Sequence, residues 1–188
     1  MEITCPRECR YLRTSRTHPA SIVRKQHDRD LAFAAGVLRT LSRPQEELCW
    51  ELLGVVARFA GDPLLRLEDA DVIDAVSALA STVETSAKGV IYEHRPNSLV
   101  AQRLVSDVRA WLEEAAKAGA RIPDSDLAVV LRRLSEGFKE ARQAPSSAAD
   151  PTFCLAALGR LHKAIVDSGR GQAAGLRLAS PGPALIRP

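Results

Sequence analysis

One short run of the sequence, Gly89 to Pro96, gathers side chains that can handle protons and bind anions. Glu93 and His94 are adjacent, and a carboxylate beside an imidazole can act as a proton-transfer pair near neutral pH. Arg95 adds a guanidinium group, which binds phosphate or carboxylate groups through two parallel hydrogen bonds. The run could therefore support proton transfer or anion binding.

The same residues also have a structural interpretation as the end of a helix. Histidine and arginine are favoured at a helix C-terminus because their positive charge complements the helix dipole. Pro96 disfavours the α conformation at Arg95, so we expect the helix to stop at or before that residue. Ser98 would then cap the next helix.

Both interpretations place this run at a corner between two helices, with the first turn of the second helix beside it. The helix-end interpretation needs no reaction, so it favours a recognition corner over a catalytic centre. We predict that the partner-binding residues at this corner are Tyr92, Glu93, His94, Arg95, Gln102 and Arg103.

A second candidate site is the C-x-x-x-C pair formed by Cys5 and Cys9. A structural zinc site usually takes four ligands arranged in two close pairs. No second pair accompanies this one, and Leu12 stands where an iron–sulfur run would need a third cysteine. Binding of zinc or iron at Cys5 and Cys9 remains an alternative to free thiols near the terminus.

Helical periodicity suggests a further possible metal site. On helices, Cys49, Cys154, His27 and His94 would each fall on an apolar stripe, so all four could point inward. A shared metal site is one interpretation. The other is ordinary packing, because a free cysteine is among the most buried residue types and behaves as a small hydrophobic side chain.

Motifs that define common enzymes are absent from the sequence. There is no G-x-S-x-G nucleophile elbow, no Gly-rich phosphate loop after a strand and no H-E-x-x-H zinc signature. Glutamate and histidine also lack the Glu-x-x-His spacing of di-iron bundles. We therefore expect no catalysis by this chain.

Charge is distributed unevenly along the 188 residues, whose formal net charge is +3. Residues 1–29 carry seven Lys or Arg side chains and three acidic ones, a balance of +4. A basic segment of this kind could bind nucleic acid or an acidic partner, and Arg132-Arg133 could add to such a surface. A solvated terminus is the competing interpretation.

No apolar run is long enough to cross a bilayer, and the first residues lack the apolar region of a secretory signal. The sequence therefore favours a cytoplasmic protein that does not span a membrane.

Composition and periodicity predict an all-α protein. Aromatic residues make up only 4% of the chain, and no alternating β-branched run is bounded by turn residues. Helical periodicity predicts segments near 21–41, 44–60, 69–95, 99–118, 124–143 and 151–168. The predicted architecture is a single bundle of five or six mostly antiparallel helices over residues 21–169, with a basic N-terminal arm over 1–20 and flexible termini including a tail over 170–188.

Together these observations predict an α-helical interaction or regulatory protein whose partner is another protein. A metal-binding helical protein and a nucleic-acid-associated protein, which would bind through residues 1–29, are the two alternatives.

Overall fold

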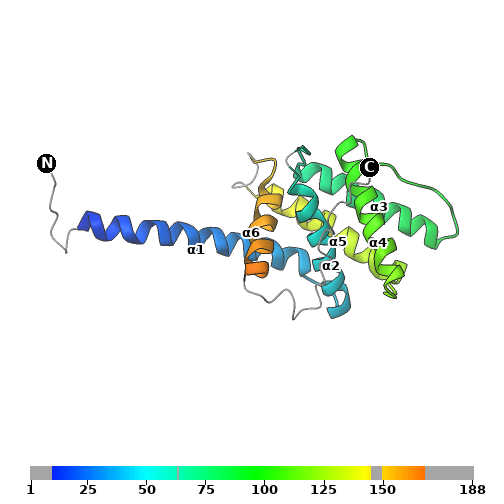
Figure 1. Cartoon of the computed structure of the whole chain (residues 1–188), viewed down its shortest axis with the longest axis horizontal. Coiled ribbons are helices and arrows are strands. Elements are labelled where there is room, and N and C mark those ends of the chain that lie inside the picture. The colour runs from blue at the N-terminus through cyan, green and yellow to red at the C-terminus, as the bar shows by residue number, and fades with distance from the viewer. Residues whose placement is uncertain (1–9, 63, 145–149, 168–188) are drawn as a thin grey trace, which may run out of the picture.

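The computed structural model describes residues 10–62, 64–144 and 150–167, and within these ranges the chain forms helices and no β-strand. The all-α prediction is therefore confirmed (Figure 1). The predicted tail over 170–188 lies outside the described residues. The six helices are α1 (Arg10–Leu38), α2 (Arg43–Ala60), α3 (Asp69–Ala87), α4 (Leu99–Lys117), α5 (Asp124–Gln143) and α6 (Phe153–Asp167).

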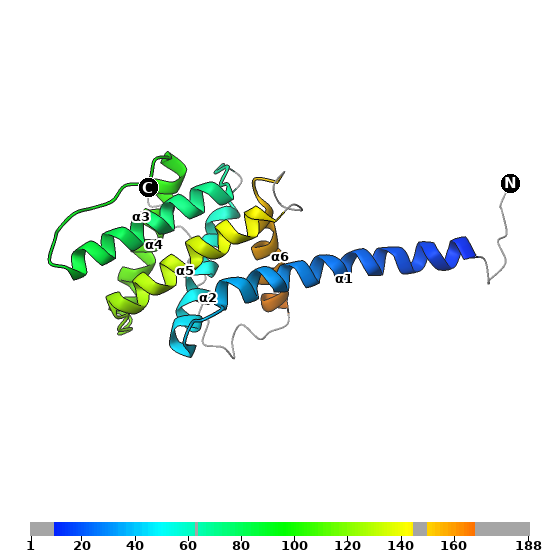
Figure 2. The same ribbon diagram turned by 180° about the vertical axis from the view of Figure 1, so that it is seen from behind.

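The first helix is longer than its periodicity suggested, because it begins at Arg10 rather than Ser21. Part of the predicted N-terminal arm is therefore helical. At 29 residues α1 is roughly 43 Å long. Its N-terminal half extends away from the other helices, as Figures 1 and 2 show from opposite sides.

The apolar stripe that would place His27 inward also contains Val23 and Leu31, and this phase was wrong. Val23 is 68% exposed and Leu31 is 47% exposed, whereas Phe33 and Val37 are buried. Val23 lies in the projecting half of the helix, where no neighbouring helix covers it, whereas Leu31 is out of phase with the face of Asp30, Phe33 and Val37 that packs on the bundle.

Two buried charged residues hold α1 in the bundle. Asp30 accepts two hydrogen bonds from Arg160 of α6, both at 2.8 Å, and a third from Gln26 at 2.9 Å. Burial raises the pKa of Asp30, but these hydrogen bonds outweigh burial and leave the pKa below its ordinary value. Arg133 of α5 donates to the Gly36 carbonyl and to the carboxylate of Glu140, so α1 is held between α5 and α6.

The centre of the bundle is the antiparallel pair α3 and α5. Leu131, Leu134 and Phe138 of α5 are almost fully buried. Phe138 meets Phe33 of α1 edge to face, with ring centroids 5.3 Å apart. The residues of α2, α3 and α4 that complete this core are mainly Leu, Val and Ala, as the low aromatic content requires.

α4 departs from the predicted antiparallel arrangement, because it runs in the same direction as α3. Ser98, its N-cap, donates to Asp71 in the first turn of α3 at 2.6 Å. Farther along α4, Arg109 pairs with Glu93, whose neighbour His94 is bonded to Thr82 near the other end of α3. The connection between the two helices therefore returns along α3 before α4 begins.

The last helix is capped by a residue from α3. The Asp69 carboxylate accepts the backbone N–H of Cys154 at 2.9 Å and that of Leu155 at 3.0 Å. Asp69 itself is completely buried. The segment predicted to start near residue 151 begins slightly later: Asp150 accepts the Thr152 N–H at 2.9 Å in a turn, and α6 begins at Phe153.

Candidate functional site

The predicted recognition corner begins where α3 ends, and that end was misplaced by the sequence. α3 stops at Ala87 and does not continue towards Arg95. Gly89 adopts a φ of +77°, its N–H donates to the Ser86 carbonyl at 2.8 Å, and the Val90 N–H donates to the Thr85 carbonyl at 3.1 Å. This left-handed glycine closes the helix, because other residues adopt such a φ only with strain.

Residues 88–98, here called the strap, then connect α3 to the start of α4 without regular secondary structure (Figures 1 and 2). The His94 N–H donates to Thr82 Oγ1 at 3.0 Å, and Ser98 is bonded to Asp71. Thr82 and Asp71 are separated by roughly 16 Å of helix. Four residues of strap span that separation, and four residues reach at most about 14 Å even when fully extended. The side chains that make these bonds complete the connection, and the chain bends at residues 97 and 98.

The Tyr92 N–H donates to the Val90 carbonyl at 3.1 Å, so the strap turns at Ile91. The rings of Tyr92 and His94 meet edge to face with centroids 4.8 Å apart, so these two residues share one side. Glu93 points elsewhere and pairs with Arg109 of α4 at 2.5 Å. The hydrogen bond from Arg109 holds the pKa of the Glu93 carboxyl below its ordinary value. Glu93 and His94 consequently have separate partners, and the structure does not bring them together as a proton-transfer pair.

The six predicted corner residues divide into anchors and exposed groups. Glu93 is anchored by Arg109, His94 by Thr82 and Thr85, and Gln102 by its bond to the Pro96 carbonyl at 3.1 Å. Tyr92, Arg95 and Arg103 are exposed, as is Glu93 despite its ion pair.

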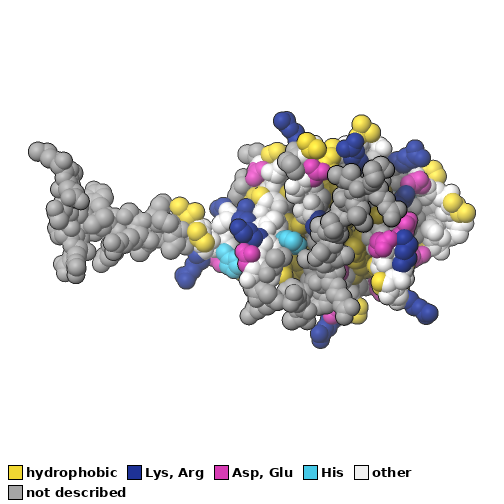
Figure 3. All heavy atoms as spheres, in the orientation of Figure 1, with side chains coloured by type: hydrophobic (Ala, Val, Ile, Leu, Met, Phe, Trp, Pro, Cys, Tyr) yellow, Lys and Arg dark blue, Asp and Glu magenta, His cyan; other side chains and the backbone are white. Residues whose placement is uncertain are grey.

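Three further exposed residues at the strap were not selected from the sequence. Ile91 is 103% exposed, Leu99 76% and Val90 53%, beside Tyr92 at 60%. Figure 3 shows apolar side chains at this end of the molecule, opposite the projecting half of α1. The available signal was Gly89, since a helix stop there would have placed Val90 and Ile91 outside the helix.

The hydroxyl-rich face of α3 has mainly structural partners. Ser77 and Ser135 of α5 share a hydrogen bond of 2.7 Å, and Thr82 donates to the Ala78 carbonyl while accepting from the strap. Ser81 accepts a hydrogen bond from Arg132 at 3.0 Å. These hydroxyls join α3 to α5 and to the strap.

Arg132 and Arg133 do not form an open cationic surface. Arg132 donates to both carboxylate oxygens of Glu84, at 2.8 and 2.7 Å, and lowers the pKa of that glutamate. Arg133 is only 7% exposed and is bonded to Glu136 and Glu140. A pocket of about 460 Å³ lies beside the pair, but its two arginines are accompanied by Glu84 and Glu136, so the lining carries as many negative as positive charges. The expected contribution of this pair to anion binding therefore finds no support.

The described cysteines and histidines do not converge. Cys49 and Cys154 are buried, and burial raises the pKa of the Cys49 thiol to about 12 and that of Cys154 still further. His27 is exposed on α1, so its predicted inward position was wrong. Within the described ranges no three His, Cys, Asp or Glu residues are grouped as a metal site would require. Cys5 and Cys9 lie outside the described residues.

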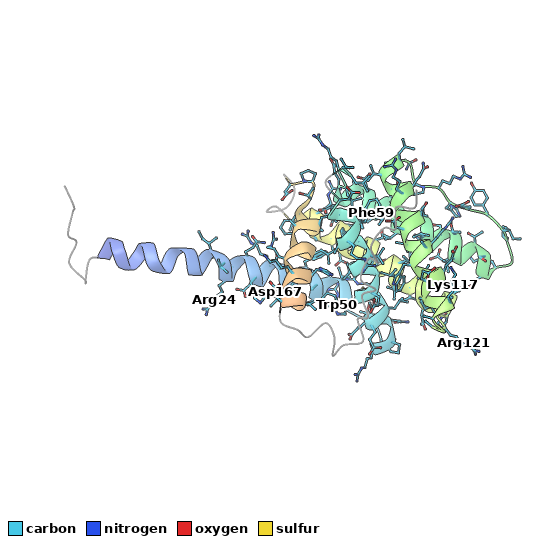
Figure 4. The ribbon with its side chains drawn as sticks, viewed as in Figure 1. Arg24, Trp50, Phe59, Lys117, Arg121 and Asp167 are labelled. Carbon is cyan, nitrogen blue, oxygen red and sulfur yellow. The ribbon has the colours of Figure 1, made fainter. Side chains whose placement is uncertain are left out.

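The basic segment forms part of the projecting helix. Residues 10–29 contain six Lys or Arg residues and one Asp, a balance of +5, which leaves −2 for the rest of the chain. Arg24, Lys25 and Arg29 are exposed. Figure 4 shows Arg24 on the part of α1 that lies away from the other helices.

The fold and the site thus define an all-α bundle with the irregular strap at one end and a basic helix at the other. Within the described part of the chain, no helix combines the length and the apolar character needed to span a membrane. No family model, no curated protein and no solved structure matches the chain.

Proposed function

We propose that this chain is a non-catalytic interaction protein that recognises a partner protein through the strap and the start of α4. The observation that carries the proposal is the exposure of Ile91, Tyr92 and Leu99 on a segment whose backbone is anchored from beneath. Exposed apolar groups beside polar ones are typical of protein–protein contact sites. A recognition surface that is already ordered loses little conformational entropy on binding.

The proposal can be tested by crosslinking at one exposed position and a matched control. A photoreactive amino acid replaces Ile91 in one variant and Leu64 in another, because Leu64 is 88% exposed and lies outside the strap. Both proteins are expressed in the native cells, irradiated and examined by mass spectrometry. The expected result is a discrete protein adduct at position 91 that disappears when Tyr92 and Arg95 are also changed to alanine.

The control position Leu64 shows which results would contradict the proposal. Identical adducts from both positions, or no adduct at position 91, would contradict partner recognition by the strap. Melting temperatures of the variants should remain within a few degrees of the parent, because the replaced side chains are exposed.

A second candidate function, binding of duplex nucleic acid by α1, is favoured by one observation. The positive charge is concentrated on a helix whose N-terminal half projects from the bundle, while the remainder of the chain is slightly acidic. A helix without neighbours can enter a major groove, and Lys and Arg side chains bind phosphates. The test is the anisotropy of a labelled 20-base-pair duplex. About four phosphate contacts would weaken binding roughly a hundredfold between 50 and 200 mM salt.

Changing Arg24, Lys25 and Arg29 to alanine should remove most of that affinity and reduce the salt dependence. Arg103 and Arg121 provide the control, since both are exposed on parts of the chain outside α1. Equal loss of binding in the two variants would indicate non-specific charge attraction and would count against this second candidate.

A further inference from the structure

We infer that the projecting half of α1 is a docking helix that packs lengthwise against an acidic amphipathic helix of a partner protein. The contact centres on Ile22 and Val23 and has Arg29 at its edge. This surface lies at the end of the molecule opposite the strap, so it is a second interface and goes beyond recognition through the strap.

The first support is that one face of α1 continues past the point where the bundle covers it. Counted back from Val37 in alternating steps of four and three residues, this face contains Phe33, Asp30, Gln26 and Val23. Such a spacing is typical of a helix that packs lengthwise on another helix. Phe33 and Val37 are 6% and 0% exposed, whereas Val23 is 68% exposed. The same face is therefore buried in one half of α1 and open in the other.

The cover ends at Asp30, where α6 reaches α1. Asp30 accepts hydrogen bonds from Arg160 and Gln26, and these bonds close the end of the packed face. Beyond them no helix of the described chain lies against α1, as Figures 1 and 2 show. Ile22, which is 54% exposed, lies on the other side of the same face from Val23, because successive residues of a helix are turned by about 100°. Together they form an apolar pair that a second helix can cover.

The second support is the charge beside this apolar pair. Residues 10–29 have a balance of +5, and Arg24, Lys25 and Arg29 are exposed. None of the ion pairs among the described residues involves these three side chains. Figure 3 shows hydrophobic side chains where α1 leaves the bundle, with Lys or Arg side chains beside them. Charged residues that flank the apolar contact of two helices select the partner, so the complementary helix is acidic.

A second copy of α1 is a poor occupant. Residues 10–29 of another copy would have the same six basic side chains and the single acidic residue Asp28. Asp28 is five residues from Val23 and is therefore turned about 140° away from it around the helix. Two such helices would place like charges along their contact in either direction, which disfavours their association. We therefore assign the face to a helix of a different protein.

Nucleic acid is the other polyanion that this charge could attract. Phosphate groups would neutralise Arg24, Lys25 and Arg29, but they would leave Ile22 and Val23 exposed to water. An acidic amphipathic helix neutralises the charge and also covers the apolar pair. The combination of exposed aliphatic and basic side chains therefore favours a helix, and binding of a duplex becomes a separate outcome of the test.

The probe is a fluorescently labelled peptide of three heptads, with leucine at positions a and d and glutamate at e and g. Its anisotropy is measured with the full-length protein at about 0.15 M salt, where long-range attraction is largely screened. The dissociation constant should lie below about 100 µM, and a value above this would overturn the inference. Forms with lysine at e and g, or with alanine at a and d, should bind at least about tenfold more weakly. Equal binding of the glutamate and lysine forms would also contradict it.

The first pair of variants tests the apolar contact. Ile22→Ser combined with Val23→Ser should weaken binding of the glutamate peptide more than about tenfold. Leu31→Ser combined with Val129→Ser is the matched control, because both residues are 47% exposed and lie on other surfaces. The control should change the affinity less than about twofold. Melting temperatures of all these proteins should agree within a few degrees, because the replaced side chains are exposed.

The second pair tests the charge at the edge of the contact. Arg29→Glu should weaken binding of the glutamate peptide about tenfold and strengthen binding of the lysine form. Arg24→Glu, on the side of α1 away from the packed face, should change either affinity less than about threefold. Equal effects within either pair of variants would contradict the assigned face.

A labelled duplex is measured with the same proteins. The double serine variant at Ile22 and Val23 retains every charge, so it should not alter the affinity of a duplex that binds through phosphates alone. Duplex binding without peptide binding would show that α1 serves nucleic acid and that the docking helix is wrong. The crosslinking result at Ile91 is independent of all these measurements, so recognition by the strap stands or fails separately.

Discussion

Gly137 of α5 lies directly against Val37 of α1, with no room for a methyl group between them. A Cβ at position 137 would lie 2.6 Å from Val37 Cγ2 and 3.1 Å from Val37 Cα. Gly137→Ala should therefore destabilise the protein by about 1–3 kcal/mol through overpacking. Urea unfolding followed by circular dichroism measures this loss.

Two companion variants identify the cause. Gly36→Ala is the control, because a Cβ there meets no atom within 4 Å, and it should not reduce stability. Val37→Ala removes the nearer contact, so the double variant should cost less than the two single changes added together, by roughly 1 kcal/mol. Strict additivity would show that the Gly137 effect does not arise at Val37.

Asp69 provides a prediction with a defined pH dependence. Burial raises the pKa of its carboxyl, and the hydrogen bonds from Cys154 and Leu155 only partly oppose burial. A raised folded-state pKa means that the folded protein binds the proton more tightly than the unfolded chain does. The contribution of Asp69 to stability is therefore greatest below the unfolded pKa of about 3.9 and falls as pH rises through the folded pKa.

The comparison uses Asp69→Asn, which resembles the neutral acid and does not titrate. The free energy of unfolding of the parent, measured relative to this variant, should decrease as pH is raised from about 4 towards 7. Asp69→Ala should cost about 2–3 kcal/mol near pH 4, because two buried N–H groups lose their acceptor, and this cost should fall with rising pH as the parent itself loses stability. A pH-independent difference between parent and Asn variant would contradict the raised pKa.

The strap should loosen when its bond to α3 is removed. Thr82→Val keeps the shape of the side chain but leaves the His94 N–H without its acceptor, at a cost of about 1–2 kcal/mol. Amide exchange at His94 should then accelerate relative to core amides of α5. Thr82→Ser retains the oxygen and is expected to preserve the parental exchange rate. Similar rates in all three proteins would show that this bond does not hold the strap.

The turn between α3 and the strap should depend on glycine. Gly89 has a φ of +77°, so Gly89→Ala introduces strain of about 1 kcal/mol although no atom lies near the new methyl group. Gly159→Ala, in α6, also meets open space but has no such φ, and it should be neutral or stabilising. Thermal unfolding measures both variants. A lower melting temperature for Gly89→Ala but not for Gly159→Ala would show that the cost comes from backbone strain at residue 89.

Local signals in the sequence predicted most helices well. Pro44 falls in the first turn of α2, the Ser98 hydroxyl accepts the Ala101 N–H, and Gly119 follows α4 with a φ of +90°. Each signal acts through neighbouring residues, so it can be read from a short window. The start of α1 was missed because its first turns lack an apolar stripe. A helix that projects from the bundle has no neighbour to pack against and needs no such stripe.

The candidate site was less predictable, because its geometry depends on residues distant in sequence. Pairing of Glu93 with adjacent His94 was one interpretation of the sequence, but the partner of Glu93 is Arg109. The sequence did not indicate that α4 would run parallel to α3. Gly89 was the one local signal of the turn after α3. The cap of α6 by Asp69 was equally inaccessible, since 85 residues separate donor and acceptor.

The cap that Asp69 places on α6 also constrains the order of events during synthesis. A ribosome makes α3 long before residues 154 and 155, so until then the Asp69 carboxylate remains hydrated. The inner surface of α5 at Phe138 likewise waits for Cys154, whose thiol reaches the Phe138 carbonyl at 3.9 Å. The nascent chain can therefore assemble its central helix pair early, but its native state is reached only after α6 has left the exit tunnel.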